Sequence, residues 1–185
     1  TSLFRAIKKV HVECAGTMDE AKPAALAFLK GMLNDRIPDR VNYINAETLA
    51  IELGIGIEHS YTSDCGSYTN LIRTQVTGET DCTEIHGSVF EGNQIRLVNI
   101  LGYEFDVTPY GTMLFARNKD VPGVIGKVGT MLGKANVNIG AYLLSREMND
   151  GEAFAVIRVD NPVAEDILND LEDLPEIISV QQLHC

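Results

Sequence analysis

The residues best suited to chemistry lie between Arg117 and Ile139, where a predicted strand turns into a predicted helix. Pro122 and Gly123 form the turn, and a helix that begins there leaves backbone N–H groups unpaired at its positive end. Those donors suit a small carboxylate, and Asp120 could pair with an ammonium group. The segment therefore offers anion and cation recognition side by side, which is what a free amino acid requires.

Two asparagines extend this candidate site. Asn118 shares the strand-end edge with Asp120, and we expect Asn138, which opens the next strand, to reach the same end of the sheet. The candidate binding residues are Asn118, Asp120, Val121, Pro122, Gly123, Val124 and Asn138. A purely structural role is the alternative, because Asp in such a turn is often a helix N-cap and Asn often satisfies local backbone groups.

Three glycines lie inside the predicted helix, at Gly126, Gly129 and Gly133. Each costs about 1 kcal/mol relative to alanine in a helix interior. Something should therefore approach this helix closely. Tight helix packing is one explanation, and room for a ligand beside a subunit interface is the other.

Residues 1–110 are expected to form a domain of their own, separate from the one that holds this turn. Their pattern predicts an α+β unit with a meandering sheet. Helices are expected over Asp19–Leu33 and after Asn45 as N-cap. The expected strands are Ile7–Cys14, Ile55–Tyr61, Tyr68–Val76, Cys82–Phe90, Ile95–Ile100 and Tyr103–Val107.

Residues 111–185 hold the candidate site, and their pattern changes to strand, helix, strand, strand, helix, strand. This βαββαβ order predicts a ferredoxin-like fold with two helices on one face of a four-stranded antiparallel sheet. The expected elements are Thr112–Arg117, Pro122–Ala135, Asn138–Arg146, Ala153–Val159, a helix opened by Asn161 and Pro162, and Ile177–Leu183. Asn149, Asp150 and Gly151 form the predicted hairpin turn.

The composition excludes several classes of function. The 185 residues carry 15 Lys plus Arg against 26 Asp plus Glu, a formal net charge of −11, which disfavours nucleic acid and anionic membranes as partners. No apolar run approaches the ~20 residues that cross a bilayer. Four cysteines without a CxxC pair favour a reducing, cytoplasmic setting, and no metal site is expected.

Nothing in the sequence predicts a catalytic centre. No GxGxxG turn follows a predicted strand, so no dinucleotide site is expected in this chain. Ser, His and Asp form no set at a recognisable catalytic spacing. The chain is therefore interpreted as a regulatory piece with no catalytic residues.

Several motifs resemble one family. NKDVPGVIGKVGTMLGKANVNIGAYLLSR, GEAFAVIRVD and ISVQQLHC, within Thr112–Cys185, closely resemble the ACT domain at the C-terminus of D-3-phosphoglycerate dehydrogenase. Upstream, VNYINAETLAIELGI, YTNLIRTQVTG and IHGSVFEGNQIRLVNILGYEFDV resemble the intervening, or allosteric substrate-binding, domain of the longer forms of that enzyme. The resemblance covers nearly the whole chain.

The resemblance implies a ligand and a mode of assembly. L-serine, the end product of the pathway, binds between two ACT domains in this family and inhibits the enzyme. The positions that match its contacts are Asn118, where some members have His or Tyr, Asp120 and Asn138. Self-association through the ACT domains is therefore expected, and another small amino acid is the alternative ligand.

The resemblance also bears on the rest of the enzyme. NAD would bind to domains of the parent enzyme that this chain lacks. In the intervening domain, Arg96 falls where the family has a basic residue at a proposed anion site, and Thr108 stands where some members of the family have another basic residue. An exposed strand residue without a ligand is the alternative for Arg96.

Two other interpretations stay open. One is the small regulatory subunit of an iron–sulfur L-serine dehydratase, although such chains carry an SSSHT-like motif near their start and this one reads TSLFRAIKKVHVE. The other is a free-standing amino-acid-binding ACT module. The start at Thr1 without a Met favours a piece of a longer protein over that second alternative.

Overall fold

The computed structural model describes residues 7–18, 20–34, 36–38, 40–146 and 151–185. The chain divides into two compact units, Thr1–Gly102 and Tyr103–Cys185. The sequence places the boundary later, between Tyr110 and Gly111. The difference arises from strand β6 (Tyr103–Val107), whose aromatic side chains pack in the second unit.

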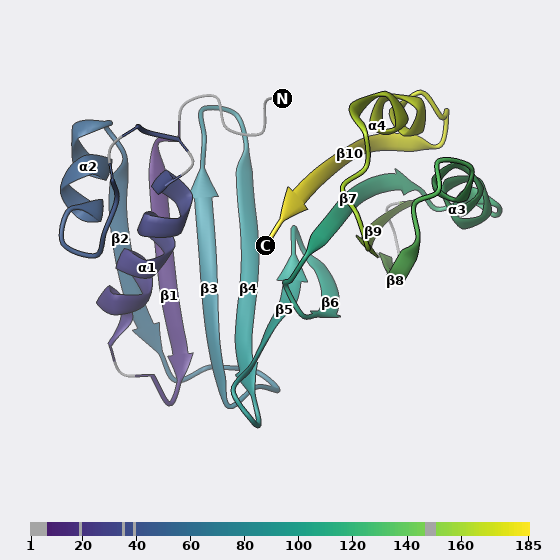
Figure 1. Ribbon diagram of the computed structural model, residues 1–185. Coiled ribbons are helices and arrows are strands. Elements are labelled where there is room, and N and C mark those ends of the chain that lie inside the picture. Colours follow the sequence, from purple (N-terminus) through teal and green to yellow (C-terminus); the bar gives the residue numbers. More distant parts are fainter. Residues whose placement is uncertain (1–6, 19, 35, 39, 147–150) are drawn as a thin grey trace. The chain divides into compact units, whose positions relative to one another are not determined.

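The first unit is a mixed sheet with two helices. Its strand order is β2-β1-β3-β4-β5, with β1 and β2 parallel and the other neighbours antiparallel. Figure 1 labels these elements. Their bounds are β1 Lys9–Gly16, α1 Ala21–Asn34, α2 Ala46–Glu52, β2 Gly56–Thr62, β3 Asn70–Thr77, β4 Cys82–Phe90 and β5 Gln94–Ile100.

One face of this sheet is covered by helices. Ala25, Leu29 and Leu33 recur at helical spacing on α1 and are buried against Val10 and Val12 of β1. Figure 1 shows α1 lying across β1. Because side chains alternate along a strand, His11 and Glu13 of β1 belong to the opposite face of the sheet.

Of the two expected helix starts, the one at Asn45 is confirmed, because Asn45 is the N-cap residue of α2, and the one at Asn161 is wrong. Asn45 precedes α2 but makes no side-chain cap; its amide instead accepts the Asn42 N–H at 2.7 Å and donates to the Arg40 carbonyl at 2.9 Å. The helix predicted from Asn161 begins only at Glu165. Val163 stays outside it because both its N–H and its carbonyl are hydrogen-bonded to the Gln182 side chain. Asp19, Asn149 and Asp150 lie outside the described residues.

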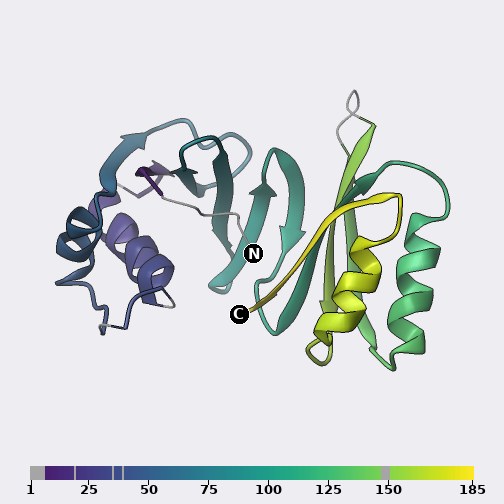
Figure 2. The ribbon, with the colours of Figure 1, turned by 90° about the horizontal axis from the view of Figure 1, so that it is seen from above.

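The second unit confirms the ferredoxin-like prediction. Its sheet has the order β10-β7-β9-β8, with antiparallel neighbours. Figure 2 shows α3 and α4 side by side on one face of this sheet. The bounds are β6 Tyr103–Val107, β7 Thr112–Lys119, α3 Val124–Lys134, β8 Ile139–Arg146, β9 Glu152–Val159, α4 Glu165–Glu172 and β10 Ile177–His184.

The core of this unit lies between the helices and the sheet. Leu114 of β7, Leu132 of α3, Ile157 of β9 and Leu171 of α4 are almost fully buried there. On the other face, the Tyr103 and Phe105 rings of β6 lie 5.4 Å and 5.8 Å from the Phe154 ring. Within the described part of the chain, no helix is long and apolar enough to span a membrane.

Candidate functional site

The candidate site lies where β7 passes into α3. The Asp120 N–H donates to the Gly151 carbonyl at 2.8 Å, and the Val121 N–H donates to the Lys119 carbonyl at 2.9 Å. Gly123 then adopts a φ of 94°, in the left-handed region that favours glycine. These contacts turn the chain sharply, and α3 begins at Val124 with its first N–H groups lacking intrahelical partners.

A pocket of about 370 Å³ opens beside this turn. Its lining comprises Asn118, Asp120, Val121, Pro122, Gly123, Val124, Ile125, Leu144 and Arg146. All the predicted binding residues except Asn138 are therefore brought together. Charged and amide groups lie at the end of β7, and aliphatic side chains from α3 and β8 form the apolar wall.

Of the two polar residues at the end of β7, Asn118 has the purely structural role given above as the alternative, and Asp120 does not. Asn118 is 4% exposed, and its side-chain N–H donates to the Lys119 carbonyl at 2.7 Å. Asp120 is not a helix cap, because the N-cap of α3 is Gly123 and no side chain caps it. The Asp120 carboxylate instead lies 3.4 Å from Nε of Arg146. A ligand that binds Asp120 would therefore take the place of Arg146.

The expectation that Asn138 reaches the same end of the sheet within one chain is wrong. β7 and β8 both run antiparallel to β9 and are therefore parallel to each other, since α3 carries the chain back before β8 begins. Ile139 consequently pairs with Val159, which also pairs with Thr112 at the start of β7. The Asn138 side chain donates there to Asp160 at 2.7 Å.

Sequence reasoning missed Ile125, Leu144 and Arg146. The last two lie near the end of β8, and Arg146 pairs with Ala153, the residue that also pairs with Asn118. The predicted order of elements was enough to place Leu144 and Arg146, because the ferredoxin-like order makes the first two strands parallel. The end of the second strand, not its start, must therefore lie beside the end of the first.

The glycines of α3 face open space. A Cβ built on Gly126, Gly129 or Gly133 would meet no atom within 4 Å. Tight packing of α3 inside the described chain therefore does not explain them. A groove of about 490 Å³ passes over part of this surface, lined by Gly123, Gly126, Lys127, Thr130, Met131 and Leu174.

Glu176 and Tyr142 are among the groups of this unit whose pKa is shifted. The hydrogen bond from Lys127, at 2.6 Å, holds the pKa of Glu176 below its ordinary value. Burial raises the pKa of the Tyr142 hydroxyl on β8. Neither residue lines the pocket, and both shifts follow from the local fold.

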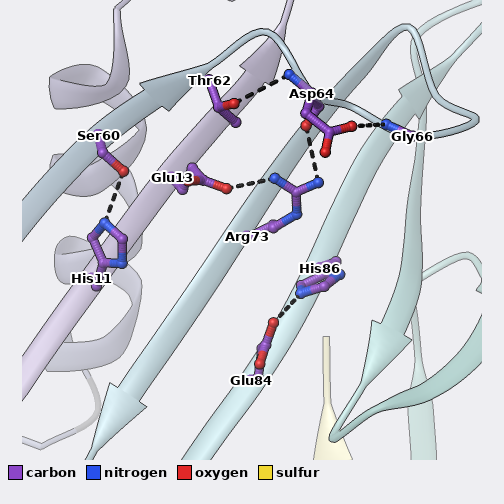
Figure 3. A network of polar contacts seen from close by, with 9 residues as sticks. All are labelled: His11, Glu13, Ser60, Thr62, Asp64, Gly66, Arg73, Glu84 and His86. Atoms are coloured by element: carbon purple, nitrogen blue, oxygen red, sulfur yellow. Dashed lines mark hydrogen bonds and ion pairs between the residues drawn. The ribbon is translucent and has the colours of Figure 1, made fainter.

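The first unit carries a second cluster of polar side chains, which we call the polar band: His11, Glu13, Arg73, Glu84 and His86 (Figure 3). Arg73 pairs with the Glu13 carboxylate and also donates to the Asp64 carbonyl at 3.0 Å. His11 is hydrogen-bonded to the Ser60 hydroxyl at 2.9 Å, and His86 to Glu84. The band crosses β1, β3 and β4 on the sheet face opposite α1.

Arg96 lies on β5, opposite Ser88 of β4. Its guanidinium donates to the Gln94 side chain at 2.7 Å. Among the residues that the structure describes, His, Cys, Asp and Glu form no group of three that could hold a metal ion. An anion at Arg96 stays a prediction.

Comparison with known proteins matches both units. The family model of the D-3-phosphoglycerate dehydrogenase intervening domain matches residues 3–101, and that of the ACT domain matches residues 112–176. The D-3-phosphoglycerate dehydrogenase of Bacillus subtilis is 29% identical over 95% of this chain and 34% of its own length. That of Archaeoglobus fulgidus is 30% identical over 94% of this chain and 33% of its own length.

A third relative, the D-3-phosphoglycerate dehydrogenase of a Synechocystis strain, is 30% identical over 82% of this chain and 27% of its own length. The chain thus spans about a third of the length of these curated relatives. The chain belongs to the D-3-phosphoglycerate dehydrogenase family and corresponds to a regulatory region of that enzyme, an intervening domain followed by an ACT domain.

Proposed function

We propose that this region senses L-serine and that serine binds in the pocket at the β7–α3 turn. The observation that carries the proposal is the pocket itself, which gathers Asn118 and the residues from Asp120 to Val124 around an open volume of about 370 Å³. The free N–H groups at the start of α3 donate hydrogen bonds to the carboxylate of serine. Asp120 binds its ammonium group.

The site is completed by a second copy of the chain. β8 is an edge strand, since β9 pairs with it on one side only. Antiparallel pairing of two β8 edges about a two-fold axis near Tyr142 removes this free edge. It also brings Asn138 at the start of one β8 beside Arg146 at the end of the other. Asn138 of the partner subunit then reaches the pocket that it does not reach within its own chain.

The open glycine surface of α3 is consistent with such an assembly, because a neighbouring chain can approach a helix without side chains closely. The remaining pocket walls, from Val121, Val124, Ile125 and Leu144, leave space for a small side chain. The proposed ligand is therefore serine, with glycine and alanine as the competitors that the walls do not exclude.

The whole enzyme, in this proposal, oxidises 3-phosphoglycerate with NAD, which binds to other domains of the enzyme. Serine bound at the ACT domains inhibits that reaction by shifting a two-state equilibrium, as end products do. The match of residues 3–101 to the phosphoglycerate dehydrogenase intervening domain favours this reading over a serine dehydratase subunit or an isolated ACT module.

The test is calorimetric titration of the chain with L-serine, glycine, L-alanine and L-threonine, with sedimentation of the same samples. We expect L-serine to bind most tightly and the chain to sediment as a dimer or larger species. A chain that binds none of the four amino acids, or that stays monomeric at high concentration while binding serine, would contradict the proposal.

A further inference from the structure

Arg146 is the charged residue of the pocket that neither the sequence motifs nor the family match assigned a role. It is the last residue of β8 and lies level with Asn118 across the sheet, because both pair with Ala153 of β9. Residues that face one another across a sheet point to the same side. Arg146 therefore lies on the helix-covered side, where Leu144 also lines the pocket.

The ion pair between Arg146 and Asp120 can be replaced by contacts to a ligand. The contact joins Nε to one carboxylate oxygen at 3.4 Å, and the Arg146 side chain is 61% exposed. Within the described residues, the terminal nitrogens of Arg146 donate no hydrogen bond. Those terminal N–H groups form the fork that binds a carboxylate through two parallel hydrogen bonds.

We infer that Arg146 binds the α-carboxylate of the amino acid, so that Asp120 and Arg146 together select a zwitterion. This inference rests on the proposed function and names a residue of the same site. On binding, the ammonium group of the ligand pairs with Asp120, and the carboxylate of the ligand pairs with Arg146. The ligand thus replaces one ion pair with two, while the net charge of the pocket stays the same.

The inference has a consequence for specificity. A ligand that lacks the carboxylate leaves Arg146 with Asp120 only, and a ligand that lacks the ammonium group meets the repulsion of Asp120. Both halves of the zwitterion are therefore needed for tight binding. Donors at the helix start alone would recognise the carboxylate without any dependence on Arg146.

The experiment crosses two ligands with two variants. Titrations with L-serine and with L-serinamide, which lacks the carboxylate charge, are made on wild type, Arg146→Gln and Arg146→Lys, with serinamide measured by displacement if its binding is weak. Arg117→Gln is the matched control, because Arg117 lies on β7 in the same sheet, pairs with Glu152 at 2.7 Å and does not line the pocket.

We expect Arg146→Gln to weaken serine binding roughly tenfold and to leave serinamide binding nearly unchanged, since a charge-assisted pair with the carboxylate is lost. Arg146→Lys should restore part of the preference for serine over serinamide, and Arg117→Gln should behave as wild type. Wild-type serine binding that Arg146→Gln does not change would overturn the inference and leave the proposed function standing.

Equal losses of serine and serinamide in Arg146→Gln would also overturn it, because a merely structural role lowers both affinities alike. Absence of serine binding to wild type would overturn the proposed function, and the inference with it. The wild-type titration therefore separates the two failures.

Discussion

The pocket of the second unit and the polar band of the first both place charged side chains on a β-sheet, but they place them differently. In the polar band, Glu13 and Arg73 face one another in the middle of adjacent strands and pair directly. In the pocket, Asp120 and Arg146 follow or end their strands, next to the start of a helix. The space beside the polar band is about 140 Å³, compared with about 370 Å³ at the turn.

The difference shows where a charged pair can serve a ligand. Mid-sheet residues are held at a fixed spacing by the ladder on both sides, so opposite charges neutralise each other. Residues at strand ends border a loop, and the helix start adds donors without partners. On this basis we expect the polar band to contribute to stability, and the pocket is the proposed binding site.

The largest expected effect is on ligand binding. Asp120→Ala removes the partner of the ligand's ammonium group and should weaken L-serine binding about tenfold or more, corresponding to about 1.5 to 3 kcal/mol. Arg73→Met, in the polar band, should leave serine binding unchanged. Calorimetric titration of the two variants measures both. Equal serine affinities in Asp120→Ala and wild type would place the site elsewhere.

The next effect is on stability. Here the substitution of Arg73 should have the larger effect and that of Arg146 the smaller one. Arg73 and Glu13 are only 27% and 26% exposed, so Arg73→Met should lower the free energy of unfolding by about 1 to 2 kcal/mol, between the values for exposed and buried pairs. Arg146→Met should change it by less than about 0.5 kcal/mol. Urea denaturation of both variants tests this. A larger loss in Arg146→Met would reverse the comparison.

A smaller and opposite effect is expected on α3. Gly126→Ala adds a methyl group that meets no atom within 4 Å, so it should raise the free energy of unfolding of the monomer by about 0.5 to 1 kcal/mol. The same substitution should weaken self-association if the glycine surface approaches a second chain. Thermal denaturation at low concentration and sedimentation at high concentration separate the two. A destabilised monomer would show that Gly126 serves a contact within the chain.

The smallest expected effect concerns acid stability. The pKa of Glu176 lies below its ordinary value of 4.5, chiefly through the hydrogen bond from Lys127. A lowered pKa contributes stability above the unfolded value, and that contribution is lost as the pH falls through the folded value. Glu176→Gln should therefore flatten the loss of stability below about pH 4.5. Denaturation at a series of acid pH values measures the slope, with Asp170→Asn, a change at an exposed position of α4, as control.

Local signals in the sequence were sufficient for the turn and for the order of elements. Pro122 and Gly123 marked the start of α3, and the change of periodicity after Gly111 predicted the ferredoxin-like unit. Pairing direction was harder, because it depends on contacts far apart in the chain. The parallel pairing of β1 with β2 and the late start of α4, held back by Gln182 on Val163, are such contacts.

The same dependence on contacts far apart in the chain explains which residues of the candidate site could be predicted. Asp120 and the turn were predictable because they adjoin in sequence. The position of Asn138 at the far end of β8, and that of Arg146 at the near end, depends on the direction of a strand that is not a sheet neighbour of β7. A pattern read along the chain contains little of that information until the topology is applied to it.

The central claim is that the serine site is shared between two chains. It is tested most directly by mixing two variants that each bind serine weakly. Asp120→Ala and Asn138→Ala chains are each expected to bind serine weakly. In a mixed dimer, one pocket receives both substitutions and the other receives neither. After random exchange of subunits, about one site in four should regain the wild-type affinity in calorimetric titration. If the mixture, shown to contain mixed dimers, binds no better than the two variants separately, the site does not combine Asp120 of one chain with Asn138 of another.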